Sequence, residues 1–191
     1  MKNKTQFWKI LLLMSCIFVF AAGQAWAATI TWNGSVDTDW NTAGNWAPAQ
    51  VPTTADDVII PTGAVVTTSG AIDAKTISIN GNSTLTIGHA TNIATAGIGG
   101  ITLNGTSALS IGAVAVAIGN ATYRGDIVMN DNSTLTTTGA SNITLSGTWT
   151  KGNDATITLD AATIFSFVGP TALSLPSTVN NFATLTVNKV G

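Results

Sequence analysis

Charged side chains are scarce in this 191-residue chain, and glutamate is absent altogether. Asp, Lys and Arg together make up only 8% of the residues, whereas hydrophobic residues make up 45%. Exposed helix faces are normally built from Glu, Lys, Arg and Gln, so this composition disfavours a helical protein. Disordered chains usually combine low hydrophobicity with high charge, and this chain has neither. A folded, non-helical protein is therefore predicted.

Cysteine and basic residues are also few. The only cysteine is Cys16, which lies in an apolar run near the N-terminus. Without that run the chain has no cysteine, which excludes a disulfide framework and a thiolate metal site. Nine aspartates in residues 28–191 are opposed by four basic residues, giving a net charge of −5; the four are Lys75, Arg124, Lys151 and Lys189. Such a chain cannot neutralise many phosphates, so we expect neither a nucleic-acid partner nor binding to an anionic membrane.

The first 27 residues have the pattern of a cleaved signal peptide. Lys2, Lys4 and Lys9 form a basic start, Ile10–Ala22 is apolar, and Ala25 and Ala27 are the small residues that a signal peptidase reads. A lipoprotein signal at Cys16 is the alternative, but it would place the acylated residue in the middle of the apolar run. The run is too short for a comfortable membrane span. We therefore expect cleavage after Ala27, a mature chain without a membrane span, and a secreted or cell-surface location.

Thr, Ser, Asn, Gly, Ala, Ile and Val dominate the mature sequence. Thr, Val and Ile favour strands, so the mature protein is predicted to be all-β. A pattern of strand, Asn/Gly/Ser corner and strand occurs three times, at Ile77–Gly88, Ile101–Gly112 and Ile127–Gly139. Its first isoleucine recurs after 24 and then 26 residues, a period typical of solenoids. We predict a single-stranded parallel β-helix (a β-solenoid) with three short strands in each coil of about 24 residues.

Alternation along the repeated strands predicts which side chains face the core. The predicted inward positions are Ile77, Ile79, Leu85, Ile87, Ile101, Leu103, Leu109, Ile111, Ile127, Met129 and Leu135. The predicted outward positions are Thr84, Thr86, Ser110, Thr134 and Thr136. Asparagine tolerates left-handed backbone and bonds locally, so stacked corner amides are predicted at Asn80, Asn104 and Asn130. The outward threonines also raise a remote alternative, an ice-binding solenoid, although Ala108 and Ser110 make its middle row defective.

The head of the mature chain differs from the repeats because it contains three tryptophans within fifteen residues, Trp32, Trp40 and Trp46. Their irregular spacing does not fit one strand face. We interpret them as an N-terminal cap over the first coil, since a solenoid needs a terminal cover. The alternative is an aromatic platform on which sugar rings stack. An extended strand is predicted next, bracketed by Pro52 and Pro61, with Asp56 and Asp57 at a turn or strand entry rather than in a metal site.

Several head motifs carry a resemblance to known proteins: Trp32-x-Gly34, Asp39-Trp40, Asn45-Trp46, Val51-Pro52 and Asp56-Asp57-Val58-x-Ile60-Pro61. They resemble the opening module of bacterial secreted β-helix repeat proteins, which are large adhesin-like or autotransporter-associated surface proteins. A more distant similarity is to the eight-glycine domain of extracellular carbohydrate-handling proteins. The first resemblance implies a right-handed parallel β-helix, export, and a surface or matrix role. It transfers no catalytic residue.

Candidate chemistry is sparse. Asp126 and Asp131, with Arg124 nearby and Asp154 on a later coil, form the only candidate carboxylate cluster. The simpler interpretation is that these residues lie in a solvated turn. Arg124-Gly125-Asp126 also spells a tripeptide that some integrins read, which by itself is a weak signal. His89 is the only histidine and has no triad-like company. No catalytic residue, cofactor or metal is assigned.

The sequence thus predicts three segments: a signal peptide (1–27), a Trp-rich cap with the first strand (28–64), and β-helix coils (65–191). The period of the repeats is lost after residue 140, and the last residues resemble the start of another strand, so we expect truncation of a longer repeat protein. The leading hypothesis is a non-enzymatic, exported structural or adhesive segment of a bacterial surface protein. Its expected partners are a polysaccharide or a host or matrix surface, and further repeats of its own chain. A carbohydrate-binding or carbohydrate-processing β-helix is the alternative.

Overall fold

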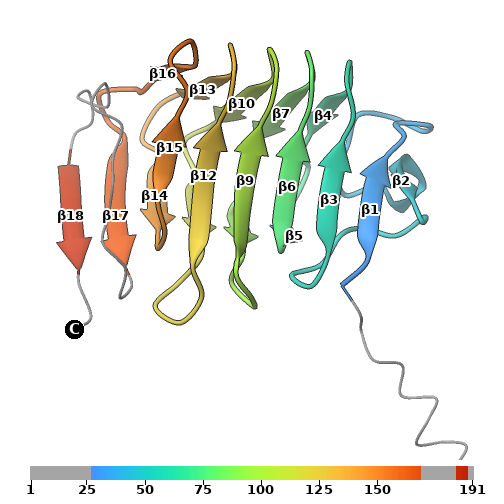
Figure 1. Ribbon diagram of the computed structural model, residues 1–191. Coiled ribbons are helices and arrows are strands. Elements are labelled where there is room, and N and C mark those ends of the chain that lie inside the picture. The colour runs from blue at the N-terminus through green and yellow to red at the C-terminus, as the bar shows by residue number, and fades with distance from the viewer. Residues whose placement is uncertain (1–26, 169–183, 189–191) are drawn as a thin grey trace, which may run out of the picture.

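Figure 1 shows the computed structural model of the chain, which describes residues 27–168 and 184–188. Short strands wind into a β-solenoid of about 6 turns with about 24 residues per turn. Three parallel sheets run along the stack, and one strand of each coil joins each sheet. The predicted fold class is confirmed. The predicted signal peptide lies outside the described residues except for Ala27.

The first sheet has seven strands in the order β15-β12-β9-β6-β3-β1-β2. These are β1 (Thr29–Trp32), β2 (Trp46–Ala47), β3 (Asp57–Ile60), β6 (Thr76–Ile79), β9 (Gly99–Leu103), β12 (Gly125–Met129) and β15 (Trp149–Lys151). Every pairing in it is parallel except that of β1 with β2, which is antiparallel. A single 3-10 turn, Ala43–Asn45, precedes β2.

The other two sheets lie behind the first in Figure 1. The second has five strands in the order β16-β13-β10-β7-β4: β4 (Val65–Thr67), β7 (Thr84–Ile87), β10 (Ala108–Ile111), β13 (Thr134–Thr137) and β16 (Thr156–Thr158). The third has six strands in the order β18-β17-β14-β11-β8-β5: β5 (Ile72–Ala74), β8 (Thr91–Ile93), β11 (Ala115–Ile118), β14 (Asn142–Leu145), β17 (Ile164–Val168) and β18 (Thr184–Asn188).

The core is a set of apolar ladders that run through the stack. Ile77 pairs with Ile101, and Ile101 pairs with Ile127 on the next coil. Leu85, Leu109 and Leu135 form a second ladder in the same way. All eleven predicted inward positions are at most 1% exposed. Each such side chain contributes roughly 1.5–3 kcal/mol through burial, so the ladders supply most of the stabilisation.

The corner between the first and second sheets always has four residues: 61–64, 80–83, 104–107, 130–133 and 152–155. The predicted stacking of Asn80, Asn104 and Asn130 at its first position is confirmed by side-chain hydrogen bonds between them. The left-handed residue is not the asparagine, however, but the one that follows it. Gly81, Gly105 and Asp131 have φ of 63°, 68° and 52°. Each asparagine side chain points along the stack, and its neighbour makes the turn.

The corner between the third and first sheets varies in length and sets the period. It holds only Lys75 in one coil, but residues 94–98, 119–124 and 146–148 in the next three. The two longest of these loops project below β9 and β12 in Figure 1. After residue 140 the coils continue, as predicted, but their spacing shortens: Trp149 pairs with Ile127, 22 residues earlier (149 − 127). A ring in place of an aliphatic side chain hides that repeat in the sequence.

The strand that was predicted to follow the cap belongs to the parallel stack. β3 pairs with β1 on one side and with β6 on the other, so we count the first coil from Asp57. The strand predicted between Pro52 and Pro61 is shortened to β3, and only Pro61 marks its limit. Asp56 causes the difference, since its Oδ2 accepts hydrogen bonds from the amide and hydroxyl of Thr53 and closes a turn there. Its expected role at the strand entry is thus observed.

At the other end, β18 stacks in parallel on β17. This agrees with the expectation that the last residues resemble a further strand of the solenoid.

Candidate functional site

Trp32, Trp40 and Trp46 lie together at the end of the solenoid where the described chain begins. They are 4%, 0% and 1% exposed. The ring of Trp46 lies edge-on to the other two, with centroids 4.9 Å from that of Trp32 and 4.7 Å from that of Trp40. Its Nε1–H donates to the backbone oxygen of Trp40 over 2.7 Å. Rings packed in this way close the end of a core, as the cap interpretation expects. No two of them offer the coplanar exposed faces that a sugar-stacking platform requires.

A polar network fastens this cap to the first coil. The side chain of Asn45 is fully buried, and its Oδ1 accepts hydrogen bonds from the amides of Val36 and Asp37. The carboxylate of Asp39 accepts hydrogen bonds from the amide and the hydroxyl of Ser69. Hydrogen bonds lower the pKa of both carboxyls, from the Asp39 amide for Asp37 and from the Ser69 hydroxyl for Asp39. These carboxylates therefore have a structural role.

Asp126, one member of the predicted carboxylate cluster, is held in an ion pair. Nε of Arg124 lies 2.8 Å and 2.9 Å from its two carboxylate oxygens. The amide of Thr148 on the next coil donates to the same group over 2.6 Å. Burial alone would raise the pKa of Asp126, but hydrogen bonds from Arg124 and Thr148 and the charge of Arg124 lower it. Arg124 and Asp126 thus face each other rather than a ligand.

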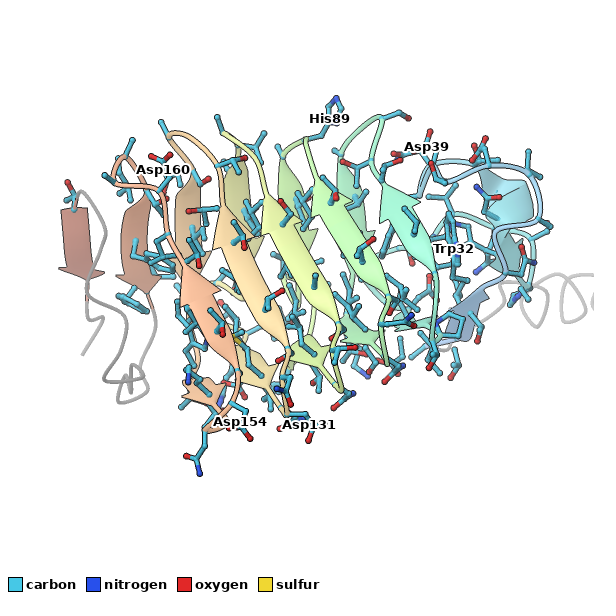
Figure 2. All side chains as sticks on the ribbon, turned by 90° about the horizontal axis from the view of Figure 1, so that it is seen from above. Trp32, Asp39, His89, Asp131, Asp154 and Asp160 are labelled. Carbon is cyan, nitrogen blue, oxygen red and sulfur yellow. The ribbon has the colours of Figure 1, made fainter. Side chains whose placement is uncertain are left out.

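Asp131 lies at the opposite end of β12 from Asp126, on the order of 15 Å away at the rise of a strand. It accepts a hydrogen bond from the amide of Gly105. In Figure 2 it lies beside Asp154 at one edge of the solenoid, whereas His89 and Asp160 lie at the other edge. The predicted cluster of Asp126 with Asp131 is therefore not assembled. Within residues 27–168 and 184–188, no three His, Cys, Asp or Glu residues are placed to hold a metal ion.

The second sheet presents the threonine rows. Thr67, Thr86, Ser110, Thr136 and Thr158 stand in register on five successive strands. The neighbouring row is Val65, Thr84, Ala108, Thr134 and Thr156, so two of its positions lack a hydroxyl. Strands lie about 4.8 Å apart, which sets the spacing along each row. The array is longer than the sequence predicted, and Val65 adds a second interruption.

A cleft lies between the cap and the first coil, with a volume of about 410 Å³. Its walls are residues 32–34 and 37–38 of the cap and residues 61–65 of the first coil; we call it the head–coil cleft. Figure 2 shows Trp32 at this junction. Sequence reasoning singled out Trp32 but not the facing corner, because about 30 residues separate the two walls. The spacing Trp32-x-Gly34 was the available signal, since a glycine beside a tryptophan permits close approach to the ring.

Comparison with protein families finds a match, described as "Domain of unknown function (DUF8693)", over residues 31–168. That span runs from β1 to the end of β17 and is most of the chain. The chain belongs to this family. The DUF8693 span therefore contains the tryptophan cap, the head–coil cleft and five successive coils. No curated protein and no solved structure matches the chain.

A membrane-spanning helix is not found in the part of the chain that the structure describes, because no helix there is long and apolar enough.

Proposed function

We propose that this member of the DUF8693 family is a non-enzymatic, exported structural or adhesive solenoid and a segment of a larger bacterial cell-surface protein. The observation that supports the proposal best is the construction of the stack. One apolar ladder runs from Ile30 to Trp149 in the first sheet and another from Ala74 to Phe167 in the third. The first end of the stack is closed by three tryptophan rings. Outward positions carry mainly Thr, Ser and Asn. A capped stack of this kind gives an extended polar surface with few charges on a rigid axis.

The polar groups of the described residues support a structural role further. Asp56, Asp39 and Asp126 each bond to backbone amides of their surroundings. His89 lies exposed at a corner, with Nδ1 3.0 Å from the backbone oxygen of Thr68. A general base or nucleophile needs a free partner within hydrogen-bond reach of a substrate. These groups are instead used to hold corners and cap in place.

Export and surface location are tested by expressing the full chain with a C-terminal tag in a Gram-negative host and fractionating the cells. We expect a mature chain that begins at Ala28, found outside the inner membrane and accessible to added protease on intact cells. A matched variant, Ala27→Leu, removes a small residue that signal peptidase reads and should leave the precursor uncleaved. Recovery of uncleaved wild-type chain in the cytoplasm would refute the proposal.

Adhesion is tested separately, by coating beads with the purified mature chain and measuring their retention on cell and matrix surfaces. Beads coated with the chain should be retained above the level of beads coated with an unrelated acidic protein. If both kinds of bead were retained equally, the adhesive role would be refuted and only the structural role would remain. The same preparation, in an ice-recrystallisation assay, tests the remote ice-binding alternative. We expect no inhibition, because Val65 and Ala108 interrupt the threonine array.

A further inference from the structure

The head–coil cleft contains a hydrogen-bond donor that the fold does not use. Trp32 is only 4% exposed, yet among the described residues its Nε1–H has no hydrogen-bond partner. The equivalent group of Trp46 donates to the backbone of Trp40. Unlike the buried unpartnered atoms of the protein, this Nε1 is accessible, so it is open to water or to a ligand. Trp40 Nε1 is also unpartnered, but it is enclosed and does not line the cleft.

Gly34 keeps that donor open. Its backbone has φ of 56°, which glycine adopts without strain, and a Cβ at this position would lie 2.9 Å from Nε1 of Trp32. Any other residue would therefore press a methyl or methylene group against the indole N–H. Gly34 and Trp32 both line the cleft, so the absence of a side chain at Gly34 leaves the indole N–H uncovered on this side.

Other residues that line the head–coil cleft carry groups that can form hydrogen bonds with hydroxyls. Asp37 provides a carboxylate that already accepts hydrogen bonds from the Asp39 amide, Asn45 and Thr42, which lower its pKa. A carboxylate has about four acceptor sites, so one remains for a ligand hydroxyl. The amide oxygen of Asn33 accepts from Ser35, which leaves its NH₂ group as a donor. Thr62 adds a hydroxyl, and Pro61 and Val65 add apolar surface. No lysine or arginine lines the cleft, so it does not favour an anion.

Much of the backbone around the cleft is already hydrogen-bonded within the protein. The amides of Asn33 and Gly34 both donate to the oxygen of Asn45. The oxygen of Thr38 accepts from Thr67, and that of Ala64 accepts from Thr84. A peptide that adds to a sheet needs free main-chain groups along an edge. β4 is the edge strand of its sheet, but it has only three residues and Thr67 already bridges to Asp39. The short edge and the side chains of the cleft favour a ligand that is rich in hydroxyl groups over an extended peptide.

We propose that the head–coil cleft binds a unit of a neutral saccharide, with Trp32 Nε1 donating to a sugar oxygen and Asp37 accepting from a hydroxyl. A sugar both donates and accepts at close spacing and presents apolar C–H patches, as this lining requires. The volume of about 410 Å³ falls within the range of small-molecule sites, roughly 300–1,000 Å³. The assignment differs from a stacking platform because it uses the edge of one tryptophan. It goes beyond the proposed structural role and does not depend on it.

The test is a titration of the full mature chain with cellotetraose, maltotetraose and chitotetraose, with tetragalacturonate as the anionic probe and a Ser/Thr-rich hexapeptide as the peptide probe. We expect at least one neutral tetrasaccharide to saturate the site and the other two classes to show no binding. In ¹H–¹⁵N spectra, the indole N–H signal of Trp32, assigned by its loss in Trp32→Phe, should shift during the titration. The signal of Trp149 should not.

Two variants locate the binding. Val65→Trp places a ring in the cleft from an exposed strand position and should weaken binding at least tenfold. Thr134→Trp adds a ring in the same outward row, three coils away from Val65. It should leave the affinity within twofold of that of the wild type. Trp32→Phe keeps an aromatic ring but removes the indole N–H donor, so binding should weaken about three- to tenfold. Urea midpoints of all three variants check that each is folded.

Lack of binding by every neutral saccharide would overturn the proposal. So would binding that Val65→Trp and Trp32→Phe leave unchanged, or binding of the hexapeptide alone. None of these results would affect export or surface location, which the fractionation experiment measures independently.

Discussion

Nδ2 of Asn104 donates a hydrogen bond to Oδ1 of Asn80 over 2.9 Å, although the two residues are 24 positions apart in the sequence. Asn130 continues the series by donating to Asn104 over 2.8 Å. At the other end, Asn80 donates to the backbone oxygen of Ile60. The chain of amides therefore links four coils at the one corner whose length never changes. It fixes the register of the first two sheets, whereas the corner between the third and first sheets varies in length.

The middle of this ladder should be its most sensitive position. Asn104→Ala removes two hydrogen bonds and leaves partners on both sides partly buried, so we expect a loss of about 2 kcal/mol in the free energy of unfolding. Asn104→Asp should cost more, because a carboxylate oxygen would face Oδ1 of Asn80. Urea unfolding followed by circular dichroism measures both changes.

Asn82 provides the matched control. It lies in the same corner as Asn80 but is exposed, so Asn82→Ala should change stability by no more than about 0.5 kcal/mol. If Asn104→Ala were no more harmful than Asn82→Ala, the ladder would not stabilise the stack.

The ladders themselves could be predicted from sequence because they depend on local alternation and on a nearly constant spacing. Ile77, Ile101 and Ile127 each stand three residues before a corner asparagine, and strand alternation assigns them to the core. The next member of that ladder is Trp149. Trp149 is not an isoleucine, and the corner before it, between the third and first sheets, has only three residues. The repeat is therefore recognisable neither by residue type nor by spacing, although the register continues unbroken.

The head–coil cleft could not be predicted in the same way. Its two walls belong to the loop after β1 and to the corner after β3, and nothing periodic relates them. Their approach depends on hydrogen bonds such as that from the amide of Trp40 to the oxygen of Thr67. The three tryptophans were recognisable as unusual, but their directions follow from packing against one another. Composition identified the cap, and only the fold places Trp32 in the lining of a cleft.

The tryptophan cap should contribute a large share of the stability. Trp46 is 1% exposed and contacts both other rings, so Trp46→Ala should lower the free energy of unfolding by about 3–5 kcal/mol. Tyr123→Ala is the control, since Tyr123 is an aromatic residue with 38% exposure on a projecting loop. Its replacement should change stability by less than about 0.5 kcal/mol. Equal effects of the two substitutions in urea unfolding would show that the cap is not part of the cooperative unit.

Gly100 should tolerate no side chain. Its φ is 143°, and an added Cβ would lie 2.1 Å from the backbone oxygen of Asp126 on the next coil. Gly100→Ala therefore forces two stacked strands apart, and we expect a loss of at least about 2 kcal/mol. At Gly97 an added Cβ meets nothing within 4 Å, so Gly97→Ala should be neutral or slightly stabilising. Thermal unfolding compares the two variants, and similar melting temperatures would contradict the close approach of β9 and β12.

The Arg124–Asp126 pair should make the solenoid sensitive to acid. Burial works against the charged form of Asp126, but the hydrogen bonds and charge of Arg124 and the bonds from Thr148 outweigh it and lower the pKa from its ordinary value of 3.8. A carboxyl whose pKa is lower in the folded state stabilises the fold fully above its unfolded-state pKa. That contribution is lost as the pH falls through the folded-state value. Stability should therefore decline as the pH drops below about 4.

Asp126→Asn isolates this contribution. The variant should lose some stability near neutral pH, where the ion pair is intact in the wild type, and show a smaller further loss on acidification. Asp37, Asp39 and Asp160 also have lowered pKa values, so part of the acid response should remain. Asp154→Asn, which removes an exposed carboxylate at a corner, should retain the wild-type response. Urea midpoints at about pH 6 and about pH 3 measure each difference. An acid response in Asp126→Asn as large as that of the wild type would mean that the carboxylate is not held by Arg124 and Thr148 in solution.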